Sequence, residues 1–595
     1  MTASVPSDGP FGIDATTLAA SLGPLPFHWQ VGTEDAARLR SLPGLAEAWR
    51  QIDDLAAAAR REPEPSLHRE AWLAYSQTGD RRPYEQQYFG RRHRLTALGL
   101  AAVVSRGAAE SALCGLIEAV CDEPAWALPA HVPDPVELID RTTVDLFAAE
   151  TGAALAELGV LMGDRLPAGL RARIAAEVDE RVLQQLLPGA PAFGWESLRN
   201  NWAAVCGGSA LMAALYVEHD PARCAALVVR CLAALDVFLD GFASDGGCAE
   251  GVVYWAYGFG YFTYAADLLE RATAGRVRIA DDPRAVRAAA FARRVDLGPT
   301  RQLTYSDATD QRPNTAALAW WARRGVAAPA VNRLSVPSDD HCGRWAPMLR
   351  TMLWCDGLPA ASVDHLDVFD DTGLAVVVRG PFAVAVKAGH NDEPHNHLDL
   401  GHVSVWLGDD QVIADIGAGP YSAAYFDPGT RYAQPAPSAA AHNAPLLDGA
   451  GQRQGPEARA TLRVTGDERS GVAEVDLTVA YDGVTALVRT VAWSLAGPVG
   501  SVEITDRLLV DPPRPSPVVT QAWLSPVQPH LSRHGDAVEW ELAAGTVRLS
   551  LPGPPVVDRL DSVDHRGRPV VWWRVAVTSR AWQSQHVSLV ATIKP

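Results

Sequence analysis

The chain has 595 residues, of which 48% are hydrophobic and 21% charged, and its net charge is −18. A chain of this length is expected to form two or more domains. The acidic excess argues against a nucleic-acid partner, because phosphate affinity comes from Lys and Arg. An acidic substrate would need a local basic or metal-lined cleft.

The first residues do not have the basic segment and long apolar run of a secretory signal. No stretch is expected to reach the length of a membrane span, so no membrane partner is expected either. The eight cysteines are scattered and form no CxxC pair. Reduced thiols and a cytoplasmic location follow as expectations. Residues 1–45 are set apart as an N-terminal segment.

Apolar residues recur at helical spacing between residues 46 and 335. Short breakers such as Asp220-Pro221 separate the runs, which is typical of antiparallel helix pairs packed side by side. The predicted helices span 95–120, 144–161, 170–187, 203–217 and 222–242.

Polar side chains directly precede the helix predicted at 203–217. They are Arg199, Asn200, Asn201 and Trp202. Asn before a helix is most often an N-cap. The same side chains at a helix start can also line a cleft and hydrogen-bond an acidic sugar, so both interpretations stay open.

A Gly-rich turn with Glu250 leads into a run of tyrosines. Steps of three and four place Tyr254, Tyr257, Tyr261 and Tyr264 along one helical face. An aromatic core stripe is the simpler interpretation. Phenols on a helix that faces a cleft can instead transfer protons.

The pattern changes near residue 340, and residues 325–345 lack periodicity, as a linker would. From 345 to 595 apolar and polar residues alternate between turns, which predicts an antiparallel β-sandwich. The predicted strands span 374–379, 382–387, 403–407, 412–416, 472–481, 487–493, 501–510, 537–542 and 570–577. The predicted fold class is therefore multidomain α+β.

The most unusual segment is HNDEPHNHLD at residues 390–399. His395 and His397 would share a face of an extended chain. Imidazole and carboxylate ligands suit Zn²⁺. Asp415 interrupts an apolar strand, where a charge must be paired or bind a metal. His442-Asn443 follows a run of small residues.

Taken together, the motifs NNW, EGxxYWxYG, HxHxD, DxG and AHN resemble the heparinase II/III superfamily of polysaccharide lyases, which includes oligo-alginate lyases. The resemblance covers most of the chain, and its β-half motifs are the more specific part. It implies an incomplete (α/α) toroid at 46–335 followed by an antiparallel β-sandwich at 345–595. It also implies β-elimination on an acidic oligosaccharide, and it is compatible with a homo-oligomer.

The resemblance assigns catalytic roles by matched position. Asn201 resembles the residue that neutralises the substrate carboxylate. Tyr254 resembles the acid or base tyrosine, with Tyr257 as the alternative, and His395 resembles the catalytic histidine. Tyr432 would add a second phenol. The substrate-binding residues implied are Arg199, Asn200, Trp202 and Glu250.

The resemblance also implies a structural Zn²⁺ near the active site, held by His397, Asp415 and His442. A hairpin turning at 408–410 would pair Asp415 with Val403, about 20 Å along the chain from His397. The HNHLD segment must therefore curl back, or Asp399 is the ligand instead.

A second departure from the resemblance lies in the helical half. Trp202 stands where many alginate-lyase relatives carry a histidine after the asparagine. If the reaction needs a histidine from this half, His395 and Tyr254 must serve without it.

Two other functions remain open. A toroid glycoside hydrolase would need two carboxylates about 5–10 Å apart across a cleft. Glu250 and Asp307 are the pair that the sequence offers. The third alternative is a non-catalytic carbohydrate-binding protein on a lyase scaffold.

Overall fold

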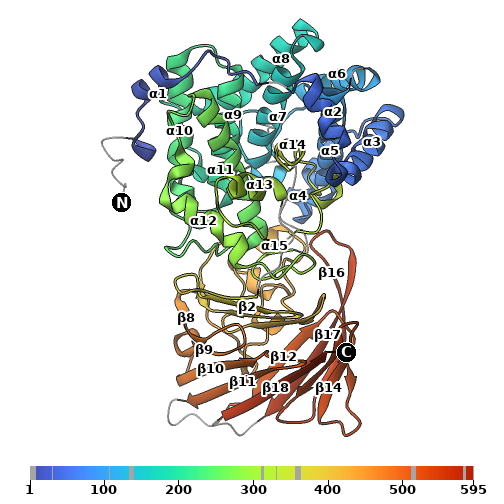
Figure 1. Cartoon of the computed structure of the whole chain (residues 1–595), viewed down its shortest axis with the longest axis vertical. Helices are drawn as coiled ribbons and strands as arrows, with labels where there is room; N and C mark the ends of the chain where they lie inside the picture. Colours follow the sequence, from blue (N-terminus) through green and yellow to red (C-terminus); the bar gives the residue numbers. More distant parts are fainter. Residues whose placement is uncertain are drawn as a thin grey trace.

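The computed structural model describes residues 9–29, 31–105, 107–132, 140–309, 314–329, 331–355, 364–510, 517–579 and 584–593. A helical N-terminal half stands on a C-terminal half made of antiparallel sheets (Figure 1). This confirms the predicted fold class. The N-terminal segment predicted at 1–45 contains α1 (Ala15–Ser21) and α2 (Thr33–Ser41), and its residues 1–8 lie outside the described part.

The helical half is centred on α9 (Asn201–Val217), whose side chains are buried along nearly its whole length. It packs against α7 (Leu146–Met162), α10 (Pro221–Leu239) and α11 (Val252–Ala272). The surrounding helices are α3 (Ala46–Arg61), α4 (Arg69–Thr78), α5 (Arg82–Val104), α6 (Ala108–Cys121), α8 (Ala168–Val178), α12 (Pro283–Arg294), α13 (Thr315–Arg323) and α14 (Trp345–Trp354).

Two predicted helices differ from the structure. The helix predicted at 95–120 is divided into α5 and α6, because Gly107 before α6 has a φ of 122°, which side chains other than glycine rarely adopt. The helix predicted at 170–187 is α-helical only to Val178. It continues as a π-helical turn (Asp179–Leu183) and a 3₁₀ turn (Gln184–Leu186).

One stretch, Leu146–Arg165, is long and apolar enough to cross a membrane, which differs from the prediction that no stretch reaches that length. It comprises α7 and the turn that follows it. The rest of the helical half buries 72% of the apolar window. Such burial is typical of a core helix, and it explains why α7 is apolar on all sides.

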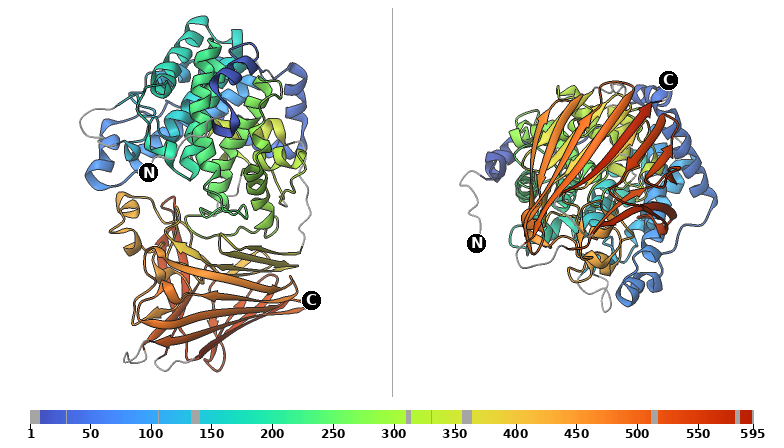
Figure 2. Two further views of the ribbon diagram at one scale, coloured as in Figure 1. Left: turned by 90° about the vertical axis from the view of Figure 1, so that its left-hand side faces the viewer. Right: turned by 90° about the horizontal axis from the view of Figure 1, so that it is seen from below.

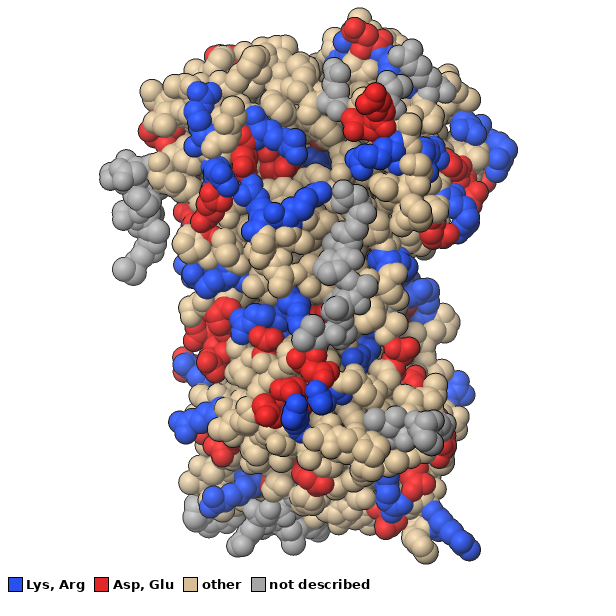
Figure 3. All heavy atoms as spheres, viewed as in Figure 1, with Lys and Arg blue, Asp and Glu red and all other residues tan. Residues whose placement is uncertain are grey.

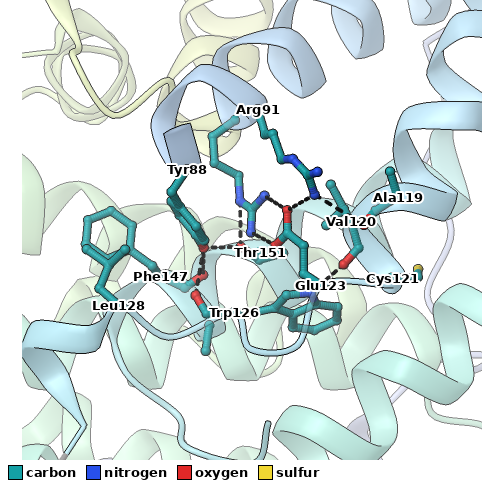
Figure 4. A network of polar contacts seen from close by, with 12 residues as sticks. Tyr88, Arg91, Ala119, Val120, Cys121, Glu123, Trp126, Leu128, Phe147 and Thr151 are labelled. Atoms are coloured by element: carbon teal, nitrogen blue, oxygen red, sulfur yellow. Dashed lines mark hydrogen bonds and ion pairs between the residues drawn. The ribbon is translucent and has the colours of Figure 1, made fainter. Parts of the chain in front are cut away.

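A buried ion network fixes α5 against α7 (Figure 4). The Glu123 carboxylate, which follows α6, accepts hydrogen bonds from Arg92 (2.6 and 2.9 Å) and Arg91 (3.2 Å). Arg92 also donates to Thr151 of α7 (3.1 Å), and its guanidinium lies 3.9 Å above the Tyr88 ring. These partners satisfy a carboxylate that is shielded from water.

The C-terminal half contains three antiparallel sheets. The five-stranded sheet has the order β1 (His365–Phe369), β2 (Leu374–Arg379), β3 (Phe382–Lys387), β5 (Val403–Leu407) and β6 (Asp410–Ile413). The nine-stranded sheet has the order β13 (His530–Leu531), β14 (Ala537–Glu541), β15 (Gly545–Ser550), β18 (Ser584–Ile593), β11 (Val499–Val510), β10 (Val484–Ser494), β9 (Ser470–Asp476), β8 (Gly455–Gly466) and β4 (Gly389–Asn391). The four-stranded sheet has the order β16 (Val556–Val563), β17 (Pro569–Ser579), β12 (Val519–Ser525) and β7 (Leu446–Leu447).

The five-stranded sheet lies between the helices and the other sheets (Figure 2). Side chains of β2 alternate between two cores. Leu374, Val376 and Val378 join the core of the helical half, whereas Ala375 and Val377 join the core of the β half. The two-residue alternation predicted for this strand therefore separates two apolar environments, not core from solvent.

The transition between the halves lies further along the chain than the sequence pattern suggested. Residues 345–354, predicted to begin the β domain, form α14. Trp345, Met348 and Leu349 of this helix are buried in the core of the helical half. Because only ten residues of helix follow an irregular segment, the short apolar run was not recognisable as helical by its periodicity.

Candidate active site and metal centre

A cleft of about 730 Å³ lies between the two halves. The helical half contributes Asn201, Trp202 and Tyr254 to its lining, and the β half contributes His395 and Tyr421. Acidic and basic side chains are interspersed over the outer face shown in Figure 3, so the net charge does not gather in one acidic patch there. Residues predicted from distant parts of the sequence thus meet at one cleft.

Asn201 is the first residue of α9 and is almost fully buried at the cleft. Its side-chain oxygen has no hydrogen-bond partner in the described structure. The preceding Asn200 is the N-cap, and its side chain accepts a hydrogen bond from the Trp202 N–H (3.0 Å). A Cβ on Gly258 would lie 2.9 Å from the Asn201 Cα, so this glycine lets α11 approach the start of α9.

Tyr254 and His395 form a stacked pair across the boundary between the halves. Their rings lie 4.1 Å apart at 18°. The Tyr254 hydroxyl hydrogen-bonds to the hydroxyl of Tyr421. Burial raises the pKa of the Tyr254 phenol above its usual range, so the group keeps its proton at neutral pH. His395 has a φ of 59°, a conformation that residues other than glycine adopt mainly where the surrounding structure imposes it.

The structure separates the remaining tyrosine candidates from this pair. Tyr257 lines the cleft, but the guanidinium of Arg344 covers its ring at 4.1 Å. Tyr432 is not among the residues that line the cleft, and its hydroxyl donates to the Asn396 side chain (2.8 Å). Tyr421 is the second phenol beside Tyr254.

Arg199, predicted to bind the substrate, is exposed and does not line the cleft. A histidine of the helical half does lie there. His131 contacts the Trp202 ring at 4.8 Å, and its Nδ1 is 2.7 Å from the Asp145 carboxylate. The helical half therefore contributes an imidazole to the cleft beside Trp202, although none follows Asn201 in the sequence.

Asp307 connects the two histidines of the HNHLD segment. Its carboxylate is fully buried and lies 2.9 Å from both His395 Nδ1 and His397 Nε2. Tyr425 and Arg431 (3.3 Å) donate to it as well. Burial opposes ionisation, but the hydrogen bonds from the two imidazoles outweigh it and hold the pKa of Asp307 well below its usual range.

An ionised carboxylate only accepts hydrogen bonds, so both imidazoles must carry their proton on the nitrogen that faces Asp307. In its neutral form His395 then has a lone pair on Nε2. His397 has one on Nδ1, which is buried and has no hydrogen-bond partner in the described structure. One carboxylate thereby fixes the tautomers of two histidines.

Glu250 lies behind Asn201, outside the cleft lining. Its carboxylate accepts a hydrogen bond from the Asn201 N–H (3.2 Å), and its second oxygen is 3.7 Å from His395 Nε2. The pKa of Glu250 is raised to about 7, mainly by burial and to a smaller extent by the Asp307 charge, while His395 and the Asn201 N–H oppose the shift. Glu250 and Asp307 therefore contact the same imidazole and do not face each other across the cleft.

His397, Asp415 and His442 form a buried cluster whose candidate ligand atoms lie within 4.8 Å of one another. Nδ1 of His397 and Nε2 of His442 have no hydrogen-bond partner in the described structure, and Nδ1 of His442 lies 3.2 Å from Oδ2 of Asp415. Unpaired buried polar atoms are costly, whereas a bound cation would satisfy them together. Two imidazoles and a carboxylate suit Zn²⁺.

The path of the chain explains how Asp415 reaches this cluster. Val405 pairs with Ile413, which leaves Asp415 just beyond β6. Residues 392–402 do not continue as a strand but curl, with backbone hydrogen bonds from Leu398 to Pro437 (3.0 Å) and from His402 to Asp399 (2.9 Å). The curled segment brings His397 back to the cluster, and Asp399 lies 3.9 Å from Lys387 instead.

Several cleft residues could not be predicted from the sequence. Tyr421, His131 and His565 come from segments without periodicity or motif, so no local signal marked them. The sequence suggested Asp307 only as one of the two catalytic carboxylates of a glycoside hydrolase. A signal was available for Asp307 alone, because its segment, Tyr305-Ser-Asp-Ala-Thr-Asp310, combines two acids with small residues inside the helical half.

Comparison with known proteins identifies the domain and the fold. Residues 362–557 match the family described as Heparinase II/III-like, C-terminal. No curated protein sequence matches the chain. Among solved structures, the chain is similar to heparinase III, with 13% identity, a TM-score of 0.61, and coverage of 93% of this chain and 92% of that one.

Two further solved structures resemble the chain over most of its length. The heparan sulfate lyase of Pedobacter heparinus is 12% identical, with a TM-score of 0.54, and the match covers 95% of this chain and 93% of that one. The Streptomyces coelicolor chondroitin AC lyase, solved with chondroitin sulphate, is 12% identical with a TM-score of 0.54, covering 94% and 82%. At these identities the likeness shows the fold alone.

Proposed function

From its heparinase II/III-like C-terminal domain and heparinase III-like fold, we propose that this protein is a polysaccharide lyase. It would cleave an acidic, uronate-containing oligosaccharide by β-elimination. The observation that carries the proposal is the meeting of Asn201, Tyr254 and His395 at one cleft, with the two rings stacked at 4.1 Å.

The reaction begins with removal of the proton at C5 of the uronate. His395 suits the role of base, because its Nδ1–H donates a hydrogen bond to Asp307 and the Nε2 lone pair of the neutral imidazole can take up a proton. The electron pair forms a C4–C5 double bond as the bond from C4 to the glycosidic oxygen breaks. The products are an unsaturated uronate and a sugar with a free hydroxyl.

The leaving oxygen needs a proton, and Tyr254 suits the role of acid. Its phenol is protonated at neutral pH because burial raises its pKa. The Tyr421 hydroxyl is hydrogen-bonded to it and provides a route for reprotonation. Two groups with stacked rings can act on the same sugar, one at C5 and one at the neighbouring oxygen.

The C5 proton is weakly acidic because the uronate carboxylate is already negative. Asn201 suits the task of neutralising that charge, since its amide is at the cleft and can donate to the carboxylate. His397, Asp415 and His442 would hold the metal ion. When bound, Zn²⁺ would supply a structural link that keeps the curled segment carrying His395 in place.

The test is incubation with heparin, hyaluronan, chondroitin, alginate and pectic oligosaccharides, followed by ultraviolet absorbance of the unsaturated product. With the substrate that is cleaved, Tyr254→Phe and His395→Ala should each lower kcat about 10²- to 10⁴-fold. Tyr84→Phe is the matched control, because its buried hydroxyl has no partner in the described structure and lies outside the cleft lining. If both variants turn over at the wild-type rate, neither Tyr254 nor His395 transfers a proton in the reaction.

The glycoside hydrolase alternative predicts products without a double bond. It needs two carboxylates on opposite sides of a cleft. Asp307 is fully buried by its four donors, and Glu250 lies outside the lining, so the geometry disfavours it. A carbohydrate-binding protein without activity would bind oligosaccharides and release no product at all.

A further inference from the structure

The hairpin of β16 and β17 extends from the β half toward the helices (Figure 1). Its strands pair to Val563 and Pro569, and the turn between them is held by Asp564. The Asp564 carboxylate accepts hydrogen bonds from the N–H groups of Arg566 (2.9 Å) and Arg568 (2.8 Å). Two residues of this turn, His565 and Arg566, line the cleft.

The turn packs directly against the reaction centre. His565 Nδ1 is 3.1 Å from the Gly419 carbonyl, and its ring meets the Tyr421 ring edge-on at 4.4 Å. Tyr421 in turn hydrogen-bonds to Tyr254. Arg566, the next residue of this turn, lines the same cleft as the phenol pair and as His341, whose ring lies 5.8 Å from that of His565.

The other arginines that line the cleft are already paired. Arg81 forms an ion pair with Glu85 (2.7 Å), Arg82 with Asp80 (2.9 Å), and Arg344 with both Asp340 (2.7 Å) and Glu150 (3.1 Å). Arg566 has no carboxylate within ion-pair distance among the residues that the structure describes.

The positive charge of Arg566 also acts on His341, which lines the cleft. Burial lowers the pKa of His341, and the charges of Arg344, His565 and Arg566 lower it further while Asp340 opposes them. A guanidinium that is partly withdrawn from water and lacks an acidic partner is a favourable place for an anion. Its two parallel N–H groups match the oxygens of a carboxylate or a sulfate.

We propose that Arg566 forms an anion-binding subsite beside the reaction centre, which takes a carboxylate or sulfate on the sugar next to the one that is cleaved. The inference rests on the proposed function and adds a specificity-determining residue to it. The subsite would favour chains that carry an acidic group on a second sugar over chains with a single uronate.

The experiment measures calorimetric binding in a Tyr254→Phe background, so that the oligosaccharide is not consumed. The probes are an alginate hexauronate, its carboxyl-reduced form, a sulfated heparan hexasaccharide and its desulfated form. Arg566→Ala should weaken binding of the acidic probes about 10- to 100-fold. Arg566→Lys should restore part of the lost affinity, because lysine keeps the positive charge but lacks the two parallel N–H groups of the guanidinium.

The two pairs of probes separate the sources of the anion. If Arg566→Ala weakens binding of the hexauronate but not of its carboxyl-reduced form, the bound anion is a carboxylate. A loss that disappears with the desulfated hexasaccharide identifies a sulfate. Arg559→Ala is the control, because Arg559 is exposed on the same hairpin, pairs with Asp561 and does not line the cleft.

Turnover by the otherwise wild-type enzyme gives the second readout. Arg566→Ala should raise KM about 10-fold or more for a cleaved acidic hexamer and leave kcat within about 3-fold. If Arg566→Ala changes neither affinity nor KM and product still forms, the subsite is overturned and the lyase proposal stands. Weakened acidic binding with no product from any probe would uphold the subsite and overturn the lyase. Failure of every acidic probe to bind would overturn both.

Discussion

At the scale of single residues, Asp307 has the most consequential set of contacts. Its carboxylate holds His395 of the cleft and His397 of the candidate metal centre at the same distance of 2.9 Å. Asp307→Asn replaces one carboxylate oxygen by an NH₂ group, which donates a hydrogen bond. The imidazole that faces this group must accept the bond and therefore change its tautomer. Asp307→Asn should lower both kcat and Zn²⁺ affinity about 10- to 100-fold.

The measurement is steady-state kinetics together with metal titration of the apoprotein. Saturating Zn²⁺ should not restore kcat, because the loss of the carboxylate beside His395 does not depend on the metal. Asp506→Asn is the control, since this equally buried carboxylate binds Arg489 and Gln521 in the β half. Full recovery of kcat by metal would limit Asp307 to the metal centre.

Glu250 predicts a pH dependence of stability. Its pKa is raised from 4.5 to about 7 in the folded protein, so the native state favours the neutral form. The stabilisation is present below the unfolded pKa and is lost as pH rises toward 7. Between pH ~5 and ~8 the loss is about 2–3 kcal/mol at about 1.4 kcal/mol per pKa unit.

Glu250→Gln keeps the acceptor for the Asn201 N–H and removes the titration. Chemical denaturation at several pH values should therefore show a weaker decline for this variant than for the wild type. Parallel curves for the two proteins would assign the pH dependence to other groups.

At the scale of elements, the buried Glu123 network fixes α5, α7 and the segment after α6. Glu123→Gln leaves the buried guanidinium of Arg92 without its counter-charge, whereas Arg91 keeps Glu64 at 2.7 Å. The free energy of unfolding should fall by about 3–5 kcal/mol. Glu118→Gln on the exposed face of α6 should change it by less than about 0.5 kcal/mol. Equal effects in denaturant titrations would mean that the network adds no stability.

The curled segment between β4 and β5 depends on its candidate metal centre. We expect about one Zn²⁺ per chain by elemental analysis, and its loss in His442→Ala. A chelator should lower the melting temperature of the wild type and have no effect on that variant, because ligand binding to the native state stabilises it. A zinc-free protein with the same melting temperature in chelator would rule out a structural metal there.

The predictions from sequence were most accurate where local periodicity determines the element. The strands predicted at 374–379, 382–387 and 403–407 have those bounds, and the helix predicted at 203–217 begins only two residues earlier. The structure also brings together Asn201, Tyr254 and His395, which motifs had marked. It does not bring Arg199 or Tyr432 to the cleft, because side-chain direction in irregular segments depends on contacts that the local sequence does not contain.

At the scale of the whole molecule, the five-stranded sheet joins the two halves. Leu374 packs into the helical core while its neighbour Ala375 packs into the β core. Leu374→Ala should therefore destabilise both halves, by about 2–5 kcal/mol for a fully buried leucine. Leu531→Ala is the control, because that side chain is 53% exposed.

Calorimetry of the wild type should show one transition, and far-ultraviolet dichroism at helical and strand wavelengths should change at the same temperature. In Leu374→Ala both signals should shift together. Separate transitions for the helical and strand signals would show that the shared sheet does not couple the halves.

The shared sheet also has a consequence for biosynthesis. The helical half leaves the ribosome first, because it precedes the sheet in the chain. Until β1, β2 and β3 follow, the apolar surface that receives Leu374, Val376 and Val378 is open to water. We therefore expect the newly made helical half to bind chaperones, and expression of residues 1–355 alone should give aggregated protein.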